Sequence, residues 1–122
     1  MQVSITMPIH QYVFPARSVR VVDGDTLILE ISVGFYLTTT HSVRLLRVNA
    51  PEMKTPTYAE GHAAKAYVEA WLAEGAIGDW PYVVETHKSD VFGRYLAEVW
   101  RLSDGTNLSD ALLDSGNAVA YP

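Results

Sequence analysis

Two stretches of alternating apolar residues flank an Asp-Gly pair in the first third of the chain, and they constrain the fold more than any other feature. The alternation runs through residues 18–22 and residues 26–31, and Asp23-Gly24 lies between them. A period of two is typical of strands with one buried face, and Asp-Gly between such strands favours a tight hairpin. A third apolar run follows the polar residues 38–40, after a weaker turn signal at Val33-Gly34. We therefore expect an antiparallel meander of three strands, whose alternating apolar residues are Val19, Val21, Leu27, Leu29 and Ile31 in the first two strands.

The spacing of the apolar residues becomes helical after Pro56. Thr57-Tyr58-Ala59-Glu60 has the spelling of a capping box, in which the threonine side chain accepts a hydrogen bond from the first turn. We predict a helix of roughly four turns from about Thr57 to Glu74, ending near Gly75. Its apolar stripe consists of Ala64, Val68, Trp71 and Leu72.

Two further strands and a short helix complete the predicted fold. The strands occupy residues 82–88 and about 94–102, and a polar turn at residues 89–93 joins them. Asn107 can cap a short final helix, which Gly116 ends. This order predicts an α+β, mainly β fold: a five-stranded Greek-key barrel of the oligonucleotide/oligosaccharide-binding (OB) type, with a helix between strands 3 and 4 and a short C-terminal helix.

We expect residues 1–122 to form one domain, because this length and a hydrophobic content of 48% suit a single core. Residues 1–16 contain Pro8 and Pro15 and show no clear period, apart from a short edge strand at residues 12–14. The chain carries 9 Lys+Arg against 14 Asp+Glu, a formal charge of −5. This balance argues against binding a polyanion through the whole surface, so any contact with nucleic acid requires a local positive site.

The chain has no cysteine, which excludes disulfides and thiolate metal sites. Any metal must therefore be bound by oxygen or by histidine. The sequence also shows no recognisable signal peptide and no apolar stretch long enough to span a membrane, so we expect a soluble and cytoplasmic protein with no membrane partner. The four histidines, which show no ligand spacing, are His10, His41, His62 and His87.

The stretch from Arg44 to Glu52 reads as an apolar strand that ends in a carboxylate. Pro51 has a fixed φ and biases its predecessor towards extended geometry, so Glu52 would leave the strand in a defined direction. Arg44 and Arg47 interrupt the apolar run, and an arginine on a buried strand needs an anionic partner. That partner could be Glu52, an aspartate or a ligand phosphate.

Three short clusters could carry chemistry, and each has a simpler explanation. Asp23-Gly24-Asp25-Thr26 could supply oxygen ligands to a cation, or it could be only a hairpin corner. Glu52 could be a positioned general base or a solvated turn carboxylate. Gly93-Arg94 could be an ordinary turn or could present a guanidinium that grips phosphate oxygens. Each signal is weak when it is taken alone.

Taken together, Asp25, Arg44, Glu52 and Arg94 resemble in order and spacing the active-site signature of the staphylococcal nuclease (thermonuclease) family. The resemblance covers roughly residues 17–121 and is specific because its blocks occur in register. The blocks are Val-Val-Asp-Gly-Asp-Thr at 21–26, Val-Arg-Leu-Leu-Arg-Val-Asn-Ala-Pro-Glu at 43–52, the helix with Glu60-Gly61 and Ala64-Lys65, Asp-Val-Phe-Gly-Arg-Tyr-Leu-Ala at 90–97, and Asn107 to Leu113 with Gly116 and Tyr121.

This resemblance implies a Ca²⁺-dependent endonuclease that hydrolyses phosphodiester bonds of DNA or RNA, single-stranded or flexible, and leaves 3′-phosphate ends. Glu52 would be the general base, and Arg44 and Arg94 would clamp the phosphate. The metal ligands would be Asp25, Asn49 and the backbone carbonyl of Ala50, with Asp23 and Thr26 beside them, and Phe92 and Tyr121 would contact the substrate.

The sequence departs from the family pattern at the metal and substrate positions. Asn49 stands where the family usually has a second aspartate, so calcium should bind less tightly. Ala50 replaces a threonine that binds through its carbonyl, which any residue can supply. Val91 and Phe92 replace a lysine and a tyrosine, which should weaken substrate contact.

Two further departures concern the chain as a whole. The family's type member is strongly basic, whereas this chain is acidic. The chain ends at Pro122, without the family's long C-terminal helix, and we expect the N-terminal strand or self-association to cover the exposed barrel face. The oligomeric state remains open.

The alternative to an enzyme is a nuclease-fold module that binds nucleic acid or protein without cutting it. The retained Asp25, Arg44, Glu52 and Arg94 favour the enzyme, since a binding module has no use for a glutamate beside two arginines at a phosphate site.

Overall fold

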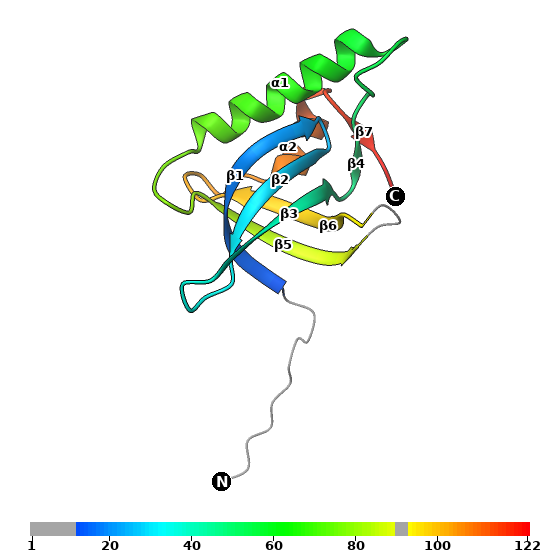
Figure 1. The fold of residues 1–122 in the computed structure, drawn as a ribbon. Helices are drawn as coiled ribbons and strands as arrows, with labels where there is room; N and C mark the ends of the chain where they lie inside the picture. The colour runs from blue at the N-terminus through cyan, green and yellow to red at the C-terminus, as the bar shows by residue number, and fades with distance from the viewer. Residues whose placement is uncertain (1–11, 90–92) are drawn as a thin grey trace, which may run out of the picture.

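The chain forms a closed five-stranded β-barrel with a helix across one end (Figure 1). The computed structural model describes residues 12–89 and 93–122. The barrel strands are β1 (Tyr12–Asp23), β2 (Thr26–Ser32), β3 (Thr38–Leu45), β5 (Tyr82–Ser89) and β6 (Tyr95–Arg101), in the order β1-β2-β3-β6-β5. The helices are α1 (Tyr58–Glu74) and α2 (Leu108–Ser115), and β4 (Val48–Asn49) pairs with β7 (Val119–Ala120) in a small second sheet.

This architecture confirms the predicted barrel. Strands β1, β2 and β3 form the expected antiparallel meander, and α1 lies between the third and fourth barrel strands. The barrel closes because β6 pairs with β3 in parallel while β5 pairs with β1. The core is filled by alternate residues of the strands and by the predicted stripe of α1, and its fully buried members include Leu27, Leu29, Val43, Val68, Val84 and Val99.

The predictions for the first strand were partly wrong. The edge strand at residues 12–14 and the strand at residues 18–22 are one continuous strand, β1. Val19 is 55% exposed and does not reach the core. The reason is a bulge: Ser18 pairs with Leu29 and Arg20 with the adjacent Ile28, so Val19 is an extra residue that interrupts the alternation.

The stretch from Arg44 to Glu52 is not the single strand that we expected. Strand β3 ends at Leu45, the chain turns at Arg47, and β4 follows at Val48–Asn49. Arg47 adopts a left-handed conformation with φ of 71°, which ends the strand geometry. The turn carries residues 48–52 away from the barrel seam and towards the first turn of α1.

Helix α1 begins where we predicted, but its N-terminus is held differently from a capping box. The Thr57 side chain accepts no capping hydrogen bond. Instead, its hydroxyl donates to the carbonyl of Glu52 at 2.7 Å. Gly61 packs in the same place, because a Cβ at this residue would lie 2.4 Å from the Glu52 carbonyl oxygen. The helix and the loop before it therefore fit only with glycine at position 61.

Helix α2 follows the prediction closely. The Asn107 side chain accepts a hydrogen bond from the backbone of Asp110, and Gly116 ends the helix in the left-handed region with φ of 77°. Within the part of the chain that the structure describes, neither helix is long and apolar enough to cross a membrane.

We predict that Gly61→Ala destabilises the protein by about 1–3 kcal/mol, because the new methyl group must displace the backbone of Glu52. Replacing glycine by alanine within a helix ordinarily stabilises the helix by about 0.8–1 kcal/mol. The change in stability that we expect for Gly61→Ala therefore has the opposite sign to the one that helix propensity predicts. The measurement is the free energy of unfolding in urea.

The matched control is Ala63→Gly, on the exposed side of the same helix. This substitution should lower the free energy of unfolding by about 0.5–1 kcal/mol through helix propensity alone, and it should leave the loop at Glu52 in place. A Gly61→Ala variant more stable than the wild type would show that the helix and the loop are not in close contact.

Candidate active site

Asp25 lies in the turn between β1 and β2, and its carboxylate is buried among polar groups. The residue is 8% exposed. Its Oδ1 accepts a hydrogen bond from the Thr26 hydroxyl at 3.1 Å, and its Oδ2 accepts one from the backbone N–H of Ala50 at 3.0 Å. The second bond joins the hairpin turn to the segment after β4. A buried carboxylate is costly unless its oxygens are satisfied, so these bonds fix where Asp25 points.

A second carboxyl group, that of Asp23, lies beside Asp25. Its Oδ1 accepts a hydrogen bond from the Asp25 backbone N–H at 3.1 Å. Burial raises the pKa of the Asp23 carboxyl, and the neighbouring Asp25 carboxyl raises it further. Two carboxylates in one partly buried place repel each other, and a bound cation would relieve that repulsion.

The side chain of Arg44, on β3, also approaches the Asp25 carboxylate. The side chain is only 13% exposed, and its Nη2 lies 3.5 Å from Asp25 Oδ2. Nη1 donates to the carbonyls of Leu45 and Val48 at 2.7 and 2.9 Å, and Nη2 donates to Asn49 Oδ1 at 3.3 Å. Of the partners that we considered for Arg44, the structure therefore supplies an aspartate. The guanidinium is fixed by the turn that leads to β4.

Arg94, just before β6, reaches this cluster through Thr26. Its Nη1 donates to the Thr26 hydroxyl at 3.1 Å, and that hydroxyl in turn donates to Asp25. Thr26 pairs with Arg44 across β2 and β3, while Leu96 pairs with Arg44 across the parallel seam. The barrel thus brings together two arginines that are 50 positions apart in the chain.

The oxygen atoms around Asp25 suit a hard cation such as Ca²⁺, which prefers carboxylate, amide and carbonyl oxygens. Asp25 and Asp23 offer carboxylates, and Asn49 offers an amide oxygen that already faces Arg44. Across residues 12–89 and 93–122, no three His, Asp or Glu side chains are grouped to hold a metal ion. Any cation here would therefore need neutral oxygens, such as those of Asn49 and Ala50, as well as carboxylates.

Glu52 stands apart from the cluster, at the end of the segment that begins with Asn49. Its side chain is 71% exposed, and its Oε2 forms an ion pair with Lys54 at 3.4 Å. The backbone of Glu52 is held by Thr57 and Gly61, as described above. The position of the residue is therefore defined by the fold, while its carboxylate remains accessible to solvent.

Of the two residues predicted to contact the substrate, the structure describes Tyr121 but not Phe92. Tyr121 lies beside the cluster: its ring is 5.7 Å from the Arg44 guanidinium, and its backbone N–H donates to the Arg47 carbonyl. The short β7 strand holds it there by pairing with β4. Phe92 lies outside the described residues, as do Asp90 and Val91.

The Arg47 side chain bonds to residues outside the Asp25 cluster. Its guanidinium binds Glu98 on β6 at 2.9 Å and Asp110 on α2 at 2.9 Å. It also donates to the Asn107 side chain. Among the alternatives that we gave for its partner, the aspartate is present, and Glu98 had not been considered. Arg47 joins the turn after β3 to β6 and α2.

Sequence analysis missed three residues that position Glu52 or pair with it. Lys54 follows Glu52 by two residues and pairs with it, which the sequence does not indicate. Thr57 was assigned to a helix cap. Gly61 did carry a signal, because a glycine inside a predicted helix is costly and often marks a close contact.

Comparison with known proteins places the chain in a family. A comparison with curated proteins gave no match. The sequence does match the model of a protein family described as staphylococcal nuclease homologue over residues 42–122, which is more than half of the chain. The matched region contains Arg44, Glu52 and Arg94, and the OB-type barrel agrees with it. The chain therefore belongs to the staphylococcal nuclease homologue family.

Proposed function

We propose that this protein is a Ca²⁺-dependent endonuclease that hydrolyses phosphodiester bonds of single-stranded or flexible DNA or RNA and leaves 3′-phosphate ends. The observation that carries the proposal is the convergence of Arg44 and Arg94 on the buried Asp25, next to a segment that ends in Glu52. Family membership supports a nuclease fold, and the contacts of this cluster support the chemistry.

The two arginines would bind the phosphate that is cleaved. Hydrolysis adds negative charge to the non-bridging oxygens, and preorganised positive groups stabilise that charge. Arg44 is held by two backbone carbonyls, so it loses little conformational freedom when a phosphate binds. Arg94 is linked through Thr26 to Oδ1 of Asp25, whereas Arg44 approaches Oδ2. A phosphate between them could accept hydrogen bonds from both guanidinium groups.

Glu52 would act as the general base that takes a proton from the attacking water. An exposed carboxylate on a fixed backbone meets the requirement for this role, because water must reach it and its position must be constant. In the free protein the carboxylate pairs with Lys54. Substrate binding would have to release Glu52 from this exposed pair, which costs little because surface ion pairs are weak.

Asp25, Asn49 and the Ala50 carbonyl, with Asp23 beside them, would hold calcium, and the chemistry that it would supply is Lewis-acid stabilisation of negative charge on the phosphate. The chain's own residues prepare the site for it. The Thr26 hydroxyl and the Ala50 N–H orient the Asp25 carboxylate, and Arg44 holds the Asn49 amide oxygen.

The second candidate is a module that binds nucleic acid without cutting it. Incubation with single-stranded DNA and RNA, first with Ca²⁺ and then with chelator, separates the two. The enzyme should release 5′-hydroxyl and 3′-phosphate ends only when the metal is present. Binding without product at any metal concentration would leave the binding module as the function.

We predict that Glu52→Gln lowers turnover by about 10²–10⁴-fold, because the amide keeps the shape of the side chain and cannot accept the proton. Nucleotide binding and thermal stability should stay close to wild type, since the side chain is exposed. The matched control is Glu60→Gln, an exposed carboxylate in the first turn of α1, which should leave turnover unchanged. Equal turnover in Glu52→Gln and wild type would remove Glu52 from the mechanism.

We predict that Arg94→Ala reduces turnover by more than about tenfold, because a charge-assisted hydrogen bond contributes about 1.5–3 kcal/mol. Arg94→Lys should rescue poorly, since an ammonium group cannot form two parallel bonds to phosphate. Arg44→Ala should lose activity and also stability, because Arg44 binds the carbonyls of the β3–β4 turn.

The control for the arginine variants is Arg20→Ala, which removes an exposed charge from β1. Steady-state kinetics and melting temperatures should be measured on all four variants and on the wild type. Full activity in Arg94→Lys would mean that Arg94 does not grip the phosphate.

We predict that Asn49→Asp makes calcium bind several times more tightly, because a second charged ligand attracts a divalent cation more strongly. The new carboxylate would lie next to Arg44, which now donates to the Asn49 oxygen, so this ion pair should limit the gain. Calorimetric titration with Ca²⁺ in the presence of a bound nucleotide measures the affinity directly. Unchanged or weaker calcium binding would place Asn49 outside the coordination sphere.

A further inference from the structure

The loop between β2 and β3 presents an apolar surface at the end of the barrel away from α1 (Figure 1). Phe35 is 92% exposed and Tyr36 is fully exposed. Both residues adopt positive φ, 57° and 61°, which is costly for aromatic residues. Hydrogen bonds between the backbones of Val33 and Leu37 and of Gly34 and Leu37 hold the loop in this form. The loop is therefore a defined projection with two aromatic rings at its tip.

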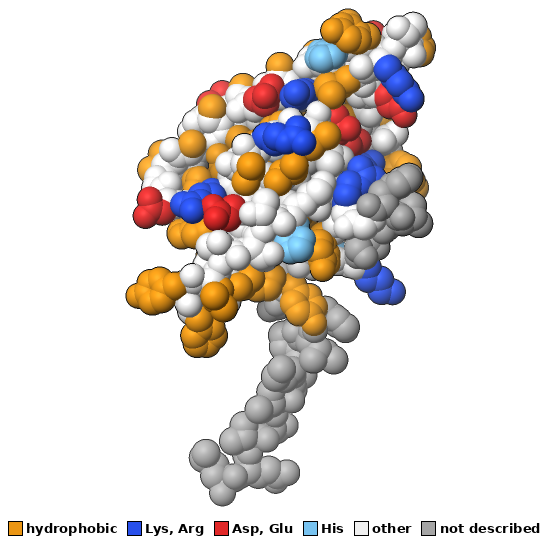
Figure 2. Space-filling view, in the orientation of Figure 1, with side chains coloured by type: hydrophobic (Ala, Val, Ile, Leu, Met, Phe, Trp, Pro, Cys, Tyr) orange, Lys and Arg blue, Asp and Glu red, His pale blue; other side chains and the backbone are white. Residues whose placement is uncertain are grey.

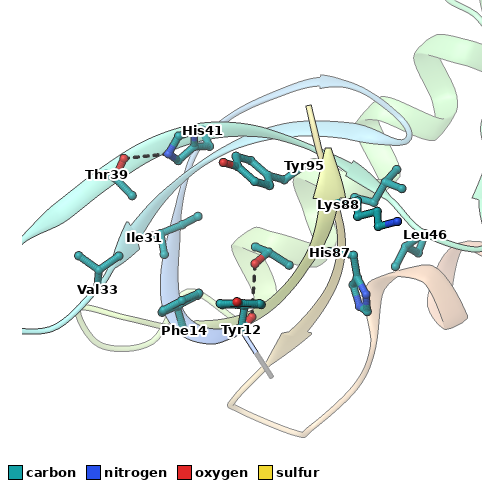
Figure 3. A pocket seen from close by; sticks show the side chains of 12 residues that line it. Tyr12, Phe14, Ile31, Val33, Thr39, His41, Leu46, His87, Lys88 and Tyr95 are labelled. Carbon is teal, nitrogen blue, oxygen red and sulfur yellow. Dashed lines mark hydrogen bonds between the residues drawn. The ribbon is translucent and has the colours of Figure 1, made fainter. Parts of the chain in front are cut away.

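A cavity of about 780 Å³ opens beside this loop, within the mouth of the barrel. Figure 3 shows Phe14 and Tyr12 on one side of it, with His41 and Tyr95 across from them. Most of its lining is apolar or aromatic, and Val33 belongs to both the loop and the cavity wall. No Asp or Glu is among the described lining residues, although the chain as a whole has a charge of −5.

We propose that this end of the barrel is the contact surface of a dimer, in which the Phe35–Tyr36 loop of each copy enters the cavity of the other. A two-fold interface requires one surface to carry both complementary features, and this end carries a projection and a hollow side by side. Hydrophobic side chains gather at this end of the molecule (Figure 2). Because the described cavity lining has no Asp or Glu, two copies can meet here without burying carboxylates against each other, and Lys88 is the charged group that both copies bring to this end.

The exposed area is large enough for a stable dimer. An aromatic side chain can bury about 150–250 Å², so Phe35 and Tyr36 from two copies would contribute about 600–1,000 Å². The cavity walls that receive them lose a comparable area, which brings the total into the range of about 1,200–2,000 Å² typical of specific interfaces. Val13 and Leu37, which are exposed and do not line the cavity, would add to it.

The first test is sedimentation of the full chain over a range of concentrations. We expect the wild type to dimerise and Phe35→Ser/Tyr36→Ser to weaken association by more than about tenfold, as removal of central aromatic contacts does. The matched control, Ile77→Ser/Leu102→Ser, removes two other exposed apolar side chains, which are 71% and 61% exposed, and should leave association unchanged. Circular dichroism checks that each variant is folded.

The second test uses the absence of cysteine from the chain. A mixture of Tyr36→Cys and Thr86→Cys proteins should form a mixed disulfide under mild oxidation, because Thr86 lines the cavity. Tyr36→Cys mixed with Leu102→Cys should not, since Leu102 follows the far end of β6. Failure of the first pair to cross-link more than the second would contradict the proposed geometry.

Two outcomes would overturn the dimer. One is a monomer at every concentration, which would mean that the cavity is covered within one chain or stays open. The other is a monomer that binds vesicles of phosphatidylcholine and phosphatidylserine through Phe35 and Tyr36, which would make the loop a membrane contact. Neither result depends on nuclease activity, so the dimer can fail while the proposed function stands.

Discussion

The burial of the Asp25 carboxylate is the constraint on which the candidate site depends. Three segments provide its partners: the hydroxyl of Thr26 from β2, the N–H of Ala50 from the segment after β4, and the guanidinium of Arg44 from β3. If any of these partners is lost, the carboxylate remains buried away from water without the bond that compensated for it, and the folded state is destabilised. The same contacts therefore stabilise the hairpin turn and place the groups that could bind metal and phosphate.

This arrangement bears on how an acidic chain could bind the nucleic acid of the proposed function. The net charge of −5 belongs to the whole chain, whereas Arg44 and Arg94 are placed together at Asp25, where a bound cation would offset the charge of the Asp25 and Asp23 carboxylates. Other arginines are engaged elsewhere: Arg47 binds Glu98 and Asp110, and Arg101 binds Asp104. Attraction of nucleic acid would thus be local, and because so few phosphates would be contacted, binding should depend on salt less than it does for a protein with a large basic surface.

Much of the fold could be predicted from local patterns, because those patterns have local causes. The Asp23-Gly24 hairpin, the stripe of α1 and the Asn107 cap each depend on residues a few positions apart. The bulge at Val19 could not be predicted, since it depends on how β1 must bend to pair with both β2 and β5. The left-handed Arg47 is stabilised by Glu98 and Asp110, which are distant in sequence.

The same distinction applies to the candidate site. The order of Asp25, Arg44, Glu52 and Arg94 indicated the set of residues, but only through resemblance to a family. The sequence could not show that Thr26 links Arg94 to Asp25, or that Lys54 pairs with Glu52, because both contacts depend on side-chain direction in three dimensions.

The topology of the barrel determines when such a site can exist during folding. The β1-β2-β3 meander and the β5-β6 hairpin are each formed from neighbouring segments, and they meet only at the β1–β5 and β3–β6 seams. Asp25 and Arg44 belong to the first unit, and Arg94 belongs to the second. Closing the seams requires loops of more than 40 residues, which makes them the slow contacts. A newly made chain would thus hold only half of the site until its second half had docked.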